Sequence, residues 1–266
     1  MAPSKTAKKG GGGGGGGSAP SPLINVPWPS LKPKTLASPE WLIPDQVCLF
    51  PNFLSTEECK SIIHLFSSSS SSTSGDSSVS NNKKVITAKK NNGPTSLALS
   101  PSPPAKRGEA VRTNYRASTI DPTFASQLYS LGLDQAVADW PSLEKHKPGT
   151  TPKRPAGLHS NIRIYRYDPQ AFFGPHYDQS SQCPTTFLNS EWTLLIYLSG
   201  PESGLTGGQT IFYDKHSAAS GGKSWEVEPR TGLALLHRHG PACMLHAGLP
   251  PLTGEKWVLR SDLLFR

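Results

Sequence analysis

The sequence predicts a mainly β domain of the sandwich or jelly-roll type, with helices packed on one side. Short strand candidates separated by turn residues fill the chain from Asn161 onward. Helical patterns precede them, and the pairs Gly207-Gly208, Gly221-Gly222 and Pro250-Pro251 punctuate the strands. Helices first and many short strands afterwards are typical of this α+β arrangement.

Composition predicts that part of the 266-residue chain stays outside this domain. The chain has 26 prolines and 25 glycines, and only 35% of its residues are hydrophobic. Segments of such composition cannot bury enough apolar surface to fold. We expect a disordered Gly/Pro/Lys-rich tail at residues 1–38, a domain over 39–266, and a disordered Ser-rich insertion at about 67–108.

Charge and cysteine usage narrow the function classes. The net charge is +8, and residues 1–108 carry a surplus of 7 while residues 109–266 carry a surplus of 1. A nucleic-acid partner would therefore have to act through the basic tail, and the near-neutral remainder argues against a nucleic-acid groove. The four cysteines form no Cys-x-x-Cys pair, which gives no sign of a disulfide framework or a zinc knuckle.

No apolar run approaches the roughly 18 residues of a membrane span, and no secretory signal pattern follows the first lysines. We therefore expect no membrane partner and an intracellular location, either the cytoplasm or the nucleus.

The chain before Asn161 contains residues that typically start helices and strands. Order should begin near Trp41, and a short buried strand is predicted over 47–50. Ser55 and Glu58 have the spacing of a capping box, which starts a helix that ends in the serine run. A strand is predicted over 111–117. Asp121-Pro122 then starts the first of two short amphipathic helices, and the second spans about 133–140.

The predicted strands of the second half are 162–167, 192–198, 210–213, 225–227, 233–237 and 256–265.

A candidate metal site lies between the first two of these strands. His176 and Asp178 are two residues apart in Gly174-Pro175-His176-Tyr177-Asp178, so on extended backbone both side chains point the same way. His246, on a returning strand, could supply the third ligand. Two histidines and one carboxylate on one face of an octahedral ion leave positions open, which is the arrangement of non-haem Fe(II) oxygenases.

Several ordered motifs carry a resemblance to a known family. They are Tyr167 nine residues before His176, the Gly-Pro-His-Tyr-Asp segment, Leu195-Ile196-Tyr197-Leu198, the 207–212 segment Gly-Gly-Gln-Thr-Ile-Phe, and a lysine ten residues after His246. Together they resemble the 2-oxoglutarate and Fe(II)-dependent dioxygenases of the prolyl 4-hydroxylase-like type. The resemblance covers about 41–66 and 109–266 and implies a double-stranded β-helix, another name for the jelly roll.

The resemblance also implies roles for individual residues. His176, Asp178 and His246 would hold iron and form the catalytic centre, and Lys256 would pair with the distal carboxylate of 2-oxoglutarate. Arg260, four residues on along the same strand face, is a second candidate because its planar fork suits a carboxylate. Tyr167 and Tyr197 match cosubstrate-contacting positions. Two departures, Gln170 in place of glycine and His237 in place of an aromatic residue, loosen any inference about substrate.

The implied activity is hydroxylation of a C–H bond with Fe2+, 2-oxoglutarate and O2, giving succinate and carbon dioxide. Ascorbate is a further candidate cofactor. A prolyl or other protein side chain is the leading substrate class. A small-molecule hydroxylase, a nucleic-acid demethylase and a non-catalytic jelly-roll binding module stay open as alternatives. The substrate, the role of the insertion and the oligomeric state are not determined by the sequence.

Overall fold

The structure, a computed structural model, describes residues 26–67, 98–142, 149–214 and 222–266. The helices are α1 (Thr56–Ser67), α2 (Pro122–Tyr129), α3 (Leu133–Ala136) and the 3-10 turns η2 (Pro201–Ser203) and η3 (Gly240–Ala242). The strands are β1 (Glu40–Ile43), β2 (Val47–Phe50), β3 (Ser100–Pro101), β4 (Tyr115–Ile120), β5 (Pro155–Leu158), β6 (Asn161–Tyr167), β7 (Phe173–His176), β8 (Asn189–Tyr197), β9 (Thr206–Gly207), β10 (Thr210–Tyr213), β11 (Ser224–Val227), β12 (Ala234–Arg238), β13 (Leu245–Gly248), β14 (Pro251–Thr253) and β15 (Lys256–Phe265).

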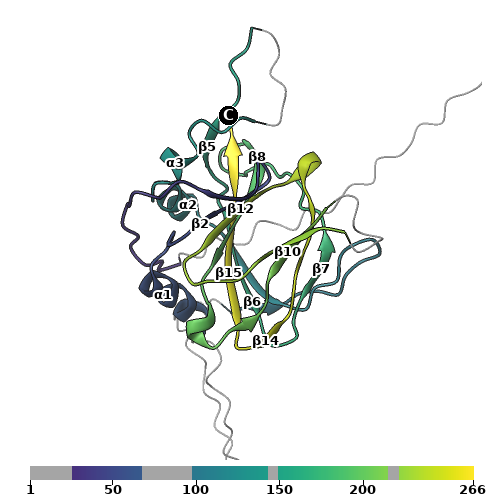
Figure 1. Cartoon of the computed structure of the whole chain (residues 1–266). Helices are drawn as coiled ribbons and strands as arrows, with labels where there is room; N and C mark the ends of the chain where they lie inside the picture. The colour runs from purple at the N-terminus through teal and green to yellow at the C-terminus, as the bar shows by residue number, and fades with distance from the viewer. Residues whose placement is uncertain (1–25, 68–97, 143–148, 215–221) are drawn as a thin grey trace, which may run out of the picture.

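Two antiparallel sheets form a sandwich (Figure 1). The large sheet has the order β1-β2-β12-β8-β15-β6-β4-β3, with β5 paired to β15, and the small sheet has the order β11-β10-β13-β7. From β6 onward the chain passes repeatedly from one sheet to the other, with β6, β8, β12 and β15 in the large sheet and β7, β10, β11 and β13 in the small one. This is a jelly roll, and the predicted fold class is confirmed.

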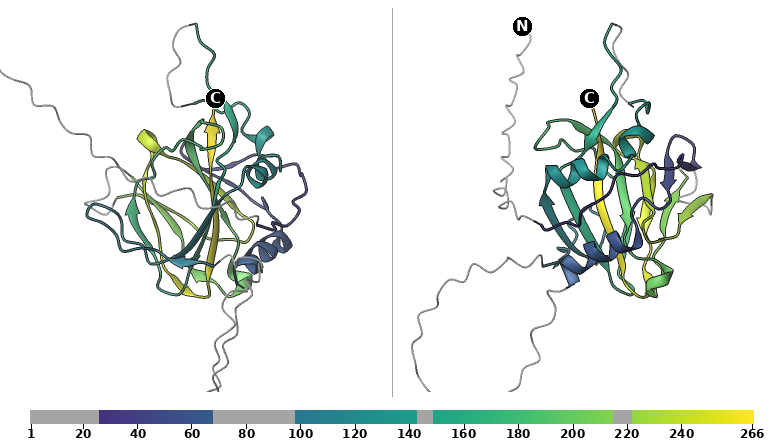
Figure 2. Two further views of the ribbon diagram at one scale, coloured as in Figure 1. Left: turned by 180° about the vertical axis from the view of Figure 1, so that it is seen from behind. Right: turned by 90° about the vertical axis from the view of Figure 1, so that its left-hand side faces the viewer.

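The helices cover the outer face of the large sheet. Figure 2 shows α1 and α2 lying across its strands, on the side away from the small sheet. Their apolar side chains join one core cluster with alternate residues of the central strands, among them Trp192, Leu194 and Ile196 of β8. The period of two in a strand then directs the intervening residues into the sandwich interior. These include Thr193 and Tyr197.

The same alternation decides what β15 contributes to the interior. Trp257 and Leu259 join the cluster under the helices, whereas Val258 joins the cluster between the sheets. Lys256 and Arg260 share the parity of Val258, so they also face the sandwich interior. Lys256 is thereby buried within the jelly roll, and Arg260 is largely enclosed there.

The predicted helix starts are confirmed in detail. The Ser55 hydroxyl accepts from the Glu58 amide at 3.1 Å, and the Glu58 carboxylate accepts from the Ser55 amide at 2.7 Å. Asp121 caps α2 by accepting from the Phe124 amide, with proline at the first turn. The second predicted helix is shorter than expected, because α3 ends at Ala136.

Residues 26–38, which the sequence analysis assigned to the tail, lie against the domain. The Trp28 ring stacks on Phe124 with centroids 4.1 Å apart, and its Nε1 donates to Asp121 at 2.9 Å. Val26 is buried. Apolar residues scattered among prolines show no helical or strand period, so composition alone did not reveal this contact. The rest of the expected tail, residues 1–25, lies outside the described residues.

The end of the expected insertion also contacts the domain, while residues 68–97 lie outside the described part. Ser100 and Pro101 pair with β4 as β3. The segment predicted as a strand over 111–117 divides, since β4 begins at Tyr115 and the residues before it run along β7. There the Gly174 amide donates to the Val111 carbonyl at 2.8 Å, and the Thr113 amide donates to the Phe172 carbonyl at 3.0 Å. Residues 111–113 therefore cover the β7 edge of the small sheet, while Ser100 and Pro101 extend the large sheet.

Within the described ranges, no helix is both long enough and apolar enough to cross a membrane.

A glycine at the start of β12 provides a test of the fold. Gly232 has φ 78°, and a Cβ there would lie 2.0 Å from the Leu54 carbonyl oxygen. Gly204 has φ 80° but nothing within 4 Å of its Cβ position. We expect Gly232→Ala to lower the free energy of unfolding by roughly 2–5 kcal/mol, and Gly204→Ala by only about 1–2 kcal/mol, the cost of left-handed backbone alone. Urea denaturation measures both, and equal losses would contradict the contact with Leu54.

Candidate metal and cosubstrate site

The three predicted ligands converge inside the sandwich. His176 ends β7, Asp178 follows two residues later, and His246 lies on β13 directly opposite His176 in the antiparallel register. One donor atom from each residue lies within 4.8 Å of the others. Asp178 and His246 are buried and His176 is partly exposed. The structure thus brings together residues that are 68 positions apart in the chain.

Backbone hydrogen bonds fix which nitrogen of each histidine faces the site. The Nδ1 of His176 lies 2.8 Å from the Gly174 carbonyl, and the Nδ1 of His246 lies 2.9 Å from the Met244 carbonyl. A carbonyl only accepts, so each Nδ1 carries the proton and each Nε2 keeps a free lone pair. Both Nε2 atoms lie 3.7 Å from a carboxylate oxygen of Asp178. This is the tautomer that a metal bound at the two Nε2 atoms requires.

Asp178 is held as a buried carboxylate by a cation and a hydroxyl. Arg260 donates through Nη1 to Oδ1 at 3.0 Å, and Thr193 donates to Oδ2 at 2.8 Å. Burial alone would raise the pKa of Asp178, but Arg260, helped by the neighbouring histidines, keeps it well below its usual value. The ligand is therefore ionised at neutral pH without any metal.

The two histidines are neutral because burial disfavours the charged imidazolium form. Burial lowers the pKa of His176 to about 4, with a further contribution from His246, and burial also lowers the pKa of His246. Two neutral imidazoles and one carboxylate form a donor set that fits Fe2+ and leaves coordination positions open.

Lys256 is a buried cation that faces aromatic rings instead of a carboxylate. Its side chain is 3% exposed, and its Nζ lies 5.5 Å from the Tyr167 ring centroid and 5.4 Å from that of Tyr197. None of the ion pairs in the described ranges includes it. Burial lowers the pKa of Lys256 to about 7. A buried amine without an anion fits a site whose anion arrives with a ligand.

The other sequence candidates take different places. Arg260 lines the cavity but is already shared between Asp178 and Asp262, which keep its guanidinium charged. Tyr167 also lines the cavity, and burial raises its pKa. The Tyr197 hydroxyl donates to Thr210 at 2.7 Å, and Tyr197 is not among the residues that line the cavity.

Sequence reasoning missed several residues of the site. Arg112 and Asn114 line the cavity from the segment after the insertion, and Arg112 lies with its Cζ 5.4 Å from the Phe173 ring centroid. The Phe173 ring stacks in turn on His176 at 3.6 Å. These residues carry no local pattern, and their contacts depend on a sheet edge that the sequence does not reveal. His237, noted only as a departure, lies 3.6 Å through Nε2 from Asp178.

Comparison with known proteins identifies the class. Residues 162–261, which include the three candidate ligands, Lys256 and Arg260, match the family described as the 2OG-Fe(II) oxygenase superfamily. Over this part of the chain, the match confirms the predicted resemblance to the 2-oxoglutarate and Fe(II)-dependent dioxygenases. Members of that superfamily use Fe2+, 2-oxoglutarate and O2, and the donor set and the buried lysine fit these groups.

Solved structures similar to this chain have low sequence identity. A viral collagen prolyl hydroxylase from Paramecium Bursaria Chlorella virus-1 is 17% identical, with 83% of this chain and 97% of that chain covered and a TM-score of 0.45. A prolyl hydroxylase from Trichoplax adhaerens, in complex with a hypoxia inducible factor peptide fragment, is 14% identical, with 83% and 84% covered and a TM-score of 0.49. An oxidoreductase of the 2OG-Fe(II) oxygenase family from Burkholderia pseudomallei is 12% identical, with 83% and 86% covered and a TM-score of 0.49. No curated protein matches the chain.

Metal binding should keep its strength to unusually low pH. Because burial lowers the pKa of His176 to about 4 and also lowers that of His246, we expect the affinity for Mn2+ to show no decline near pH 6.5 and to fall near pH 4. Calorimetric titration across the pH range in which circular dichroism shows folded protein measures this. An affinity that already declines near pH 6.5, where an unperturbed histidine titrates, would contradict the geometry.

Proposed function

We propose that the chain hydroxylates a C–H bond of a prolyl or other protein side chain, with 2-oxoglutarate and O2 as cosubstrates and succinate and CO2 as coproducts. The observation that carries the proposal is a single cavity in which the His176, Asp178 and His246 set faces a buried, anion-free Lys256. The metal would bind and activate the cosubstrates. Each residue of the chain then has a definable task.

Lys256 would receive the carboxylate of 2-oxoglutarate that is remote from the metal. A dianion entering this interior needs a cation at its far end, because an unpaired buried charge is expensive. The aromatic walls of Tyr165 and Tyr167 would exclude water along its length. Arg260 would hold the Asp178 carboxylate in place, since its fork already binds Asp178 and Asp262.

An open groove next to the cavity supports a polypeptide substrate. The groove, of about 570 Å³, has one wall formed by residues of the 103–112 segment and another formed by residues 175–179. His176 and Asp178 are among its lining residues, and Arg112 borders both the groove and the inner cavity. The lining also includes Tyr177, which is 55% exposed, and Val111, next to the lining residues Ala110 and Arg112 in the chain, is 52% exposed. An extended chain segment could lie here with one side chain directed at the metal ligands.

The charges of the groove do not favour a nucleic-acid substrate. Its lining combines Glu109 with Arg112 and adds the ligand carboxylate Asp178. A groove that follows a phosphate backbone is lined by a basic stripe instead. We therefore propose a protein substrate over a nucleic-acid one.

A coupled assay tests the proposal. With Fe2+, 2-oxoglutarate and a library of proline-containing peptides, we expect succinate formation together with peptide products about 16 Da heavier, because one oxygen atom is inserted into a C–H bond. His246→Ala should abolish both signals by removing a ligand. His64→Ala, which changes an exposed histidine of α1, serves as the matched control and should keep both.

The outcomes separate the alternatives. Succinate without any peptide product, but with an oxidised metabolite, would favour a small-molecule hydroxylase. Binding of metal and 2-oxoglutarate without succinate under any substrate mixture would favour a binding module that retains the fold. Either result would contradict the proposed function.

Cosubstrate binding should depend on pH through Lys256. Its pKa of about 7 rises when a carboxylate arrives, so binding takes up a proton at higher pH. We expect the affinity for 2-oxoglutarate, measured by calorimetry with Mn2+ in the metal site, to fall about tenfold per pH unit above 7. Lys256→Arg should remove this dependence because arginine stays charged, and Lys256→Met should weaken binding at all pH values. A flat profile for the unchanged protein would contradict the role of Lys256.

A further inference from the structure

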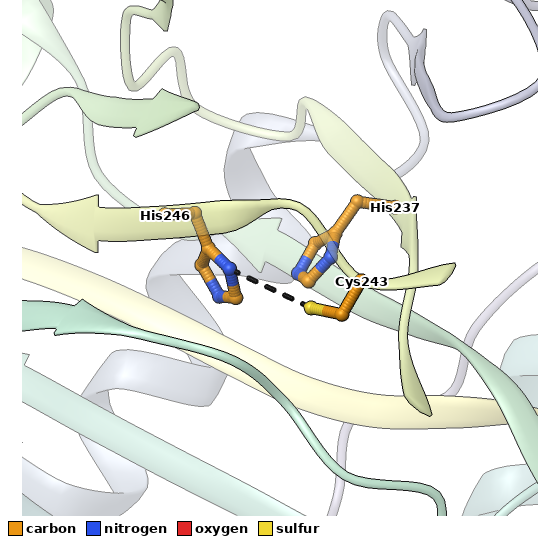
Figure 3. Close-up of side chains that lie close together, drawn as sticks. All are labelled: His237, Cys243 and His246. Atoms are coloured by element: carbon orange, nitrogen blue, oxygen red, sulfur yellow. Dashed lines mark hydrogen bonds between the residues drawn. The ribbon is translucent and has the colours of Figure 1, made fainter. Parts of the chain in front are cut away.

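A second group of metal-donor side chains lies beside the proposed iron ligands. It consists of His237 on β12, Cys243 directly after η3, and His246 on β13, and all three are buried. One donor atom from each lies within 4.8 Å of the others. Figure 3 shows the two imidazoles and the thiol converging from β12, the turn that follows it and β13, all within ten residues of the chain. The group shares His246 with the first set but contains a sulfur in place of the carboxylate.

The distances suit a small tetrahedral ion. The Sγ of Cys243 lies 3.9 Å from the Nδ1 of His246, the contact drawn in Figure 3. A zinc ion with Zn–S of about 2.3 Å and Zn–N of about 2.0 Å sets the sulfur and nitrogen roughly 3.5 Å apart. Bringing this sulfur and nitrogen to zinc-ligand spacing therefore takes a shift of about 0.4 Å, and the donor atom of His237 lies within 4.8 Å of both.

His237 supplies an independent observation. Its Nδ1 lies 3.1 Å from the Arg238 carbonyl, which leaves Nε2 as the nitrogen with a free lone pair. That Nε2 is buried, lies 3.6 Å from the Asp178 Oδ2, and has no hydrogen-bond partner. Buried polar atoms are nearly always hydrogen-bonded, so a buried nitrogen whose lone pair meets only a distant carboxylate oxygen has room for a metal ion as its partner. His237 is not one of the ligands that the proposed iron set uses.

We propose that His237, Cys243 and His246 form a site for a thiophilic divalent ion such as Zn2+, and that this site and the iron set cannot be filled together. One histidine and one thiolate next to a shared histidine give a soft donor set of two nitrogens and one sulfur, which suits Zn2+ better than Fe2+. Zinc at this site would therefore act as an inhibitor of iron loading. The inference stands on this donor geometry and does not depend on the proposed hydroxylase activity.

The exclusion follows from the tautomer of His246. A neutral imidazole has one free lone pair. The hydrogen bond to the Met244 carbonyl places that lone pair on Nε2, which faces Asp178 and the iron set. A metal next to Cys243 approaches Nδ1 instead, so the proton must move to Nε2 and the hydrogen bond to Met244 must break. His246 then presents an N–H to the iron set and no longer serves it as a ligand.

The binding step releases one proton. The Cys243 thiol donates to the Met244 carbonyl at 3.4 Å and accepts from the Asp178 amide at 3.3 Å. On metal binding the thiol proton leaves to solvent, the thiolate joins the ion, and the His246 proton only changes nitrogen. No oxidant or reductant is needed.

Cobalt substitution tests the site without any activity measurement. Titration of the metal-free protein with Co2+ should give a thiolate-to-cobalt charge-transfer band in the near ultraviolet, which should disappear when Zn2+ is added. Cys243→Ala should lack the band, while Cys183→Ala, which removes another buried cysteine, should keep it. Asp178→Asn should also keep it, because Asp178 belongs only to the iron set. Saturating Mn2+ should suppress it.

The outcomes decide the proposal. Absence of the band in the unchanged protein, its survival in Cys243→Ala, or its loss in Asp178→Asn would each overturn it. Loss of a ligand should weaken Zn2+ binding by more than the roughly 10–100-fold that loss of a supporting residue costs. If Cys243→Ala fails to fold, X-ray absorption of the zinc-loaded unchanged protein decides, since a sulfur neighbour at about 2.3 Å supports the site and a shell of only nitrogen and oxygen refutes it.

Discussion

The charged residues inside the sandwich are arranged around one buried carboxylate, that of Asp178. Asp178 lies between the two sheets, where an ionised oxygen would be costly without compensation. Arg260 binds it directly and is itself held by Asp262, which also pairs with Arg163. The four charges alternate in sign from Asp178 through Arg260 and Asp262 to Arg163 on β6. On the proposed function, an arriving metal ion would meet a carboxylate that is already ionised and already oriented.

Strand alternation explains how such charges enter the interior without weakening the core. The central strands of the large sheet direct Trp192, Leu194 and their neighbours toward the helices, where one apolar cluster provides most of the burial. The other face of the same strands is then free to carry Lys256 and Arg260. Stability and chemistry are thus assigned to opposite faces of one sheet, so a polar interior can coexist with a well-packed domain.

The sequence predicted the parts that depend on short spacing. The side chains of His176 and Asp178 point the same way because they are two residues apart on extended backbone. The strand β15 was predicted because its strand pattern extends over ten residues. His246 needed the family resemblance, since a histidine on a four-residue strand with glycine has no periodic signal. The contacts of Arg112 and Trp28 could not be predicted, because each depends on which surface the domain leaves uncovered. The sequence pointed to Tyr197, but the partner of its hydroxyl could not be predicted, because Thr210 lies on the opposite sheet.

The covering of the β7 edge by residues 111–113 has a consequence for how such proteins diversify. Residues of the 103–112 segment, which lead into this covering, form one wall of the groove beside the candidate metal ligands. On the proposed function, changes at the wall residues that face only the groove would alter what is recognised, whereas Arg112 also lines the inner cavity. Substrate selectivity and reactivity can then evolve largely separately, because the first depends on the 103–112 segment and the second on the strands of the jelly roll.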